Sequence, residues 1–102
     1  MQTLTGNSNQ AAGDLFPNLW GAVAVNAAAG LVVAAYVNRK SFFCQHNKAG
    51  VGIVYIGYDN TVAANLHVIA LAPGEWFSID DYRGEIWAIR SGAATNLMIS
   101  EV

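Results

Sequence analysis

The sequence predicts an all-β protein: a single antiparallel β-sandwich, jelly-roll-like, with about seven or eight short strands and an extended N-terminal arm. From residue 18 onward, short apolar runs are separated by turn residues at intervals of about eight to twelve positions. Several of these runs alternate apolar and polar residues, as half-buried strands do. The length, 102 residues, suits one domain.

We divide the chain into an extended N-terminal arm, residues 1–17, and a β-sandwich domain, residues 18–102. The arm is polar, rich in Gly and Asn, and closed by Pro17, and we expect it to lie on a neighbouring subunit. The run Ala72-Pro73-Gly74-Glu75 suits a type II turn, with Gly at the position that needs a positive φ. The expected strands are roughly 19–25, 30–37, 40–46, 52–58, 62–70, 75–80, 85–90 and 95–101.

The last of these strands alternates clearly, which places Leu97 and Ile99 towards the core. The runs 53–56 and 86–89 are instead apolar on both faces. Only one face of each sheet in a sandwich is core, so the outer face of these strands must be covered. We expect the arm or another subunit to cover it.

The Ala-rich stretch near the N-terminus leaves two alternatives open. Residues 27–37 also fit a helix, although Val32 and Val33 favour a strand. The uncharged run 21–37 is about as short as a membrane-spanning helix can be. Its many Ala residues and Asn26 make insertion marginal, so we expect no contact with a membrane.

Composition favours association with protein partners. Charged residues make up 12% of the chain, about half the usual ~25%, so much of the surface must be neutral or apolar. Such a surface tends to be buried against neighbours. The net charge is −2 and the basic residues are scattered, so we expect no binding of nucleic acid.

The sequence indicates no enzyme, no cofactor and no metal. Cys44 and His46 would share one face of a strand, but a Cys–His nucleophile also needs an orienting group and an oxyanion site. A metal site would require His46 and His67 to meet Asp80 or Asp81, and no spacing predicts this. Patterns typical of hydrolases, redox enzymes and nucleotide-binding proteins do not occur.

From about residue 28 to residue 102 the chain resembles a group of small virion proteins of tailed bacteriophages. The resemblance rests on the order of six motifs, with His46 as an insertion in the second of them. They are Asn38-Arg39-Lys40, Gln45-His46-Asn47, Val54-Tyr55-Ile56-Gly57, Leu71-Ala72-Pro73-Gly74-Glu75, Arg83-Gly84-Glu85-Ile86-Trp87-Ala88-Ile89 and the final Glu101.

This resemblance implies a β-sandwich in the phage particle, without enzymatic activity. We expect a capsid decoration (cement) protein that stabilises the head shell. Its partners would be the major capsid protein or other virion proteins, and copies of itself, as a trimer if it occupies local three-fold positions. It would be made in the host cytoplasm and end on the exterior of the head. The expected interface residues are Leu15, Phe16, Trp20, Tyr58, Trp76 and Tyr82.

Two alternatives remain. A component of the neck, tail or fibre base could have the same fold, and only its position or copy number would distinguish it. A carbohydrate-binding module would instead use the aromatic side chains as a platform for sugar rings.

Overall fold

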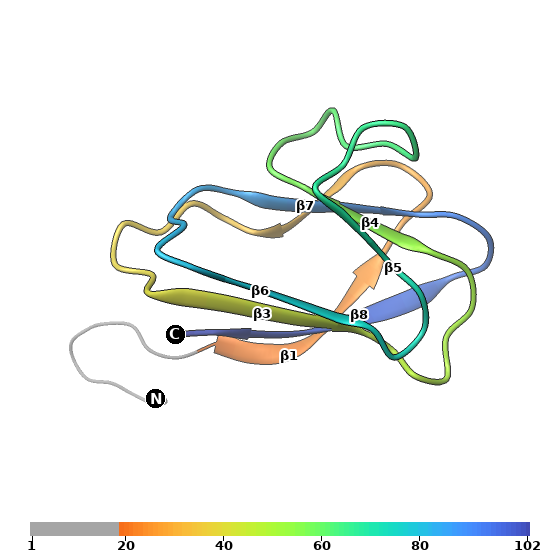
Figure 1. Cartoon of the computed structure of the whole chain (residues 1–102), viewed down its shortest axis with the longest axis horizontal. Helices are drawn as coiled ribbons and strands as arrows, with labels where there is room; N and C mark the ends of the chain where they lie inside the picture. Colours follow the sequence, from red (N-terminus) through yellow and green to blue (C-terminus); the bar gives the residue numbers. More distant parts are fainter. Residues whose placement is uncertain (1–18) are drawn as a thin grey trace.

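In the computed structural model, two four-stranded antiparallel sheets pack face to face, as Figure 1 shows. The structure describes residues 19–102. The expected arm, with Leu15 and Phe16, lies outside the described residues. The strands are β1 (Leu19–Val25), β2 (Gly30–Val33), β3 (Ser41–His46), β4 (Val54–Gly57), β5 (Ile69–Leu71), β6 (Trp76–Asp80), β7 (Ile86–Arg90) and β8 (Thr95–Glu101).

The strand order is that of an eight-stranded jelly roll. One sheet runs β1-β8-β3-β6 and the other β2-β7-β4-β5, so strands distant in sequence, such as β1 and β8, lie side by side. Every strand pair is antiparallel. The predicted fold class is confirmed, and so is the predicted type II turn. Gly74 has a φ of 87°, and Glu75 N donates to Ala72 O at 2.9 Å.

The core lies between the two sheets and is built from alternate residues of the strands. In β8, Leu97 and Ile99 are buried while Asn96 and Met98 are exposed, as predicted. The other buried apolar side chains of this core cluster come from six further strands. They are Val25, Val33, Phe42, Cys44, Val54, Ile56, Leu71, Ile86 and Ala88.

A buried arginine joins segments that are distant in the sequence at one end of the sandwich. Arg39 is 0% exposed, and its Nε donates to Glu101 Oε2 at 2.5 Å. Its Nη1 donates to the carbonyls of Tyr82 (3.2 Å) and Gly84 (2.7 Å), and its Nη2 to that of Ala34. A buried charge needs an ion partner and hydrogen bonds of this kind. These bonds tie β8 to the segment that follows β2 and to the segment that precedes β7.

The expected strand over residues 62–70 is wrong: only Ile69–Leu71 forms a strand, β5, and residues 58–68 form a loop. Local hydrogen bonds shape this loop. Asp59 accepts bonds from the backbone N and the hydroxyl of Thr61, and Ala63 and Leu66 form an isolated antiparallel bridge. Side-chain bonds of the Asp59 type compete with strand formation.

This loop covers part of the outer face of the second sheet, and Figure 1 shows it beyond β4 and β7. Val62 is buried directly over Gly57, whose added Cβ would lie 2.8 Å from the Val62 side chain. His67 packs on Tyr55 with ring centroids 4.9 Å apart. Part of the cover expected from the arm or from another subunit is therefore supplied by the chain's own loop.

The remaining sequence alternatives concern helices. Residues 27–37 contain β2 and irregular backbone, so the helical alternative is wrong. Within residues 19–102, no helix is long and apolar enough to cross a membrane.

Candidate interaction surface

The outward side of the β1-β8-β3-β6 sheet, which we call the open face, is the strongest candidate for a functional surface. Alternation along each strand fixes which side chains belong to it. The register aligns them in rows across the sheet. One row across the sheet consists of Trp20, Ser100, Phe43 and Ser78, and the next row consists of Ala22, Met98, Gln45 and Trp76. Beyond the first row lie Ser41 and Asp80, and beyond the second lie Ala24 and Asn96.

Two tryptophans mark opposite edges of this face. Trp20 on β1 is 79% exposed and Trp76 on β6 is 60% exposed. Three strand spacings of about 4.8 Å place β1 roughly 14 Å from β6 across the sheet, and the two Trp residues lie in adjacent rows. Phe43 packs beside Trp76 with ring centroids 5.8 Å apart, and Met98 is 41% exposed between the edges. Large apolar side chains exposed together on one face are typical of a protein–protein interface.

The open face is almost free of charge. Asp80, at the end of β6, is its one ionisable residue, and it contains neither Lys nor Arg. The polar groups within it are the neutral side chains of Ser, Asn and Gln. Gln45 is held in place because its Nε2 donates to Gly74 O at 2.9 Å. A neutral surface can be desolvated at lower cost than a charged one.

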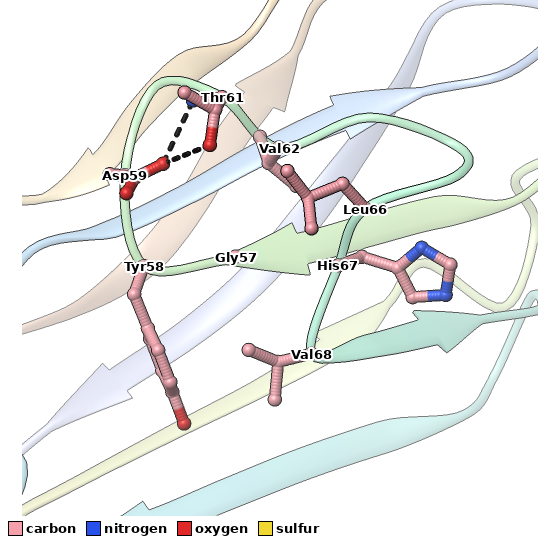
Figure 2. Close-up of a pocket in the computed structure, with 8 residues that line it drawn as sticks. All are labelled: Gly57, Tyr58, Asp59, Thr61, Val62, Leu66, His67 and Val68. Carbon is pink, nitrogen blue, oxygen red and sulfur yellow. Dashed lines mark hydrogen bonds between the residues drawn. The ribbon is translucent and has the colours of Figure 1, made fainter.

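A separate, concave site lies under the 58–68 loop, and Figure 2 shows its lining. It has a volume of about 320 Å³. Its polar groups are used to hold the loop: Asp59 turns back to Thr61, which lowers the pKa of that carboxyl, and His67 Nδ1 lies 3.2 Å from Ala63 O. The ring of Tyr58 stacks on that of Tyr82, with the ring centroids 4.5 Å apart. We therefore assign this pocket to the structure of the loop.

The candidate nucleophile Cys44 lies in the core. Its side chain is fully buried, and burial raises the pKa of the thiol to about 12. A thiol with this pKa is almost entirely protonated at neutral pH, and the thiolate is the nucleophile. His46 is also fully buried, with Nε2 3.1 Å from Gly52 O, whereas His67 lies on the outer loop. Within residues 19–102, no group of three or more metal-binding side chains comes together.

The structure separates the six expected interface residues into three groups. Trp20 and Trp76 belong to the open face. Tyr58 is 39% exposed and stacks on Tyr82, which packs against the core and donates from its hydroxyl to Glu85 O at 2.7 Å. Leu15 and Phe16 lie outside the described residues. The expected interface residues did not include Phe43 and Met98, although the alternation of β3 and β8 contains the signal for both.

No protein-family model and no curated protein sequence matches the chain. One similar solved structure is described as "Bacillus endospore appendages form a novel family of disulfide-linked pili". It has a TM-score of 0.46 and 19% sequence identity, and the alignment covers 93% of this chain and 96% of that chain.

Proposed function

We propose that the chain is a structural subunit of a bacteriophage particle, a capsid decoration protein that stabilises the head shell by binding to it. The single observation that carries the proposal is the open face, with Trp20 and Trp76 exposed and no basic residue between them. That face favours a protein partner. The motifs from Asn38 to Glu101 that resemble tailed-phage virion proteins favour the phage particle as its setting.

The size of the open face suggests how such a subunit works. Four strands about 4.8 Å apart, each about six residues long, give a footprint of roughly 400 Å². A standard interface needs roughly 800 Å² from each partner. The open face supplies about half of this area, and residues 1–17 are the proposed source of the rest. Many modest contacts repeated over a shell hold it through multivalency.

The test uses phage particles from which this chain has been removed, incubated with the purified chain. We expect the double variant Trp20→Ser, Trp76→Ser to bind such particles at least about tenfold more weakly, because two exposed aromatic anchors are lost. Leu66→Ser is the matched control: Leu66 is 59% exposed, but it lies on the 58–68 loop. Equal occupancy by the double variant and the control would show that the open face does not bind the particle.

A second candidate function rests on the same aromatic residues. Trp76 borders a groove beside β5 that also contains Glu75, and neutral Ser, Asn and Gln side chains lie between Trp76 and Trp20. Aromatic rings with neutral hydrogen-bonding groups suit a carbohydrate-binding module. Binding on a glycan array that disappears in Trp76→Ala would favour this function over the structural one.

A further inference from the structure

The four edge strands of the sandwich differ in how well they are protected from pairing with another chain. Exposed edges are normally blocked by shortness, charge, proline or a bulge. β5 has three residues, and β2 has four with a register shift between Leu31 and Val33. β6 ends at Asp80 and directly follows Glu75. Each of these three edges therefore has at least one recognised protection.

β1 has none of these protections. It has seven residues, it contains no charged residue and no proline, and it pairs with β8 without a register shift from Leu19 to Val25. Its other edge has no partner strand among residues 19–102. Such a long, uncharged edge, with an unbroken register to β8, is a template for pairing with a strand of another chain.

We propose that β1 pairs antiparallel with β1 of a second copy of this chain, about a two-fold axis at Ala22. In this register Trp20 lies beside Ala24 of the second copy, and Gly21 lies beside Val23. A large side chain thus faces a small one on both sides of the axis. Positions 20, 22 and 24 all point outwards, so the open faces of the two copies form one continuous surface.

The absence of charge makes this edge complementary to itself, because no like charges meet across the axis. The contact is small. Seven residues at about 3.4 Å each, across a sheet about 10 Å thick, give roughly 240 Å² per copy. A stable interface buries at least about 1,200 Å² in total, so the pairing is weak in solution, with a Kd between about 0.1 and about 1 mM. Multivalency strengthens it in an assembly.

The test is sedimentation velocity of the purified full-length chain from about 10 µM to about 1 mM. The average mass should rise towards that of a dimer. Ala22→Lys and Ala22→Glu, each alone, place like charges at the axis and should weaken association at least about fivefold. An equal mixture of the two variants places opposite charges there and should restore association. Ala70→Lys, an exposed position on edge strand β5, is the matched control and should associate like the unmodified chain.

Four outcomes would overturn the pairing: a monomer at every concentration, a trimer, no effect of either charge at position 22, or loss of association when residues 1–17 are deleted. The last would place the contact on the arm. The inference rests on the structural role proposed above, because it names one partner within it. The sedimentation experiment needs no phage particle. Failure of the β1 pairing can therefore be distinguished from failure of the proposed capsid decoration role, which is measured on particles.

Discussion

At the scale of single residues, Arg39 shows how motifs that are distant in the sequence meet in the fold. Its guanidinium reaches Glu101, the carbonyl of Gly84 and the carbonyl of Ala34. Three of the six motifs that resemble phage virion proteins thus meet in one buried cluster. Gln45 and Gly74, from two others, are joined by a hydrogen bond. These motif residues stabilise the fold, and the open face lies largely outside them.

Replacing Arg39 tests this cluster. Arg39→Met leaves Glu101 buried without its partner and should lower the free energy of unfolding by about 3–5 kcal/mol, measured by urea denaturation. Arg83→Met changes an exposed arginine and should stay within about 0.5 kcal/mol of the unmodified chain. Similar losses in both variants would contradict a special role for the buried ion pair.

The burial of Cys44 predicts that the folded chain loses stability at alkaline pH. Its pKa is about 12 in the folded chain and about 9.0 when unfolded, so the folded state holds its proton more tightly. The stability that the protonated Cys44 contributes to the folded state is therefore complete below pH 9. It is lost as pH rises through the window from about 9 to about 12, where the free energy of unfolding falls by about 1.4 kcal/mol per pH unit. Cys44→Ala lacks this loss. Urea denaturation at a series of alkaline pH values gives the free energy of unfolding against pH for the unmodified chain and for Cys44→Ala. The two curves should converge as pH rises, and parallel curves would contradict the raised pKa of Cys44.

At the scale of elements, most strands could be predicted from local patterns, and one could not. The ranges 19–25 and 95–101 coincide with β1 and β8 because alternation and flanking turn residues mark both. The range 62–70 is apolar enough for a strand, but Val62 packs on Gly57 instead of entering a ladder. That contact is tertiary, and a single sequence carries no signal for it apart from the small residue at position 57.

The packing of the 58–68 loop on β4 predicts the effect of a single methyl group. In Gly57→Ala the new Cβ would lie 2.8 Å from Val62, so the loop must shift, at a cost of about 1–3 kcal/mol of unfolding free energy. Gly30→Ala in β2 is the control, because its Cβ would meet nothing closer than 3.9 Å. Thermal unfolding should show a clear loss for Gly57→Ala and little change for Gly30→Ala. The opposite order would mean that the loop does not pack as described.

At the scale of the whole molecule, the open face could be predicted only in part. Low charge indicated an association surface, and aromatic content indicated candidates for it. Pattern alone did not separate Trp20 and Trp76, which lie on one sheet, from Tyr58 and Tyr82, which pack on each other. That separation depends on the jelly-roll order of the strands, which brings β1 and β6 into the same sheet.

Removing residues 1–17 separates folding from attachment. The strands and the core cluster described above all lie within residues 19–102, so the shortened chain should unfold with nearly unchanged free energy. Its occupancy on phage particles should fall, because the proposed contact area of the arm is lost. Denaturation and particle binding measured on the same preparation check both parts. Unchanged occupancy would show that the arm takes no part in attachment.

We propose that this chain is a repeated structural subunit of a phage head. The most direct test of this proposal is the number of copies per purified particle, measured by quantitative mass spectrometry against the major capsid protein. We expect hundreds of copies, because a decoration protein covers the shell. A copy number between about six and a few dozen would move the chain to the neck, tail or fibres and contradict the decoration role. Absence from the particle would contradict the virion role altogether.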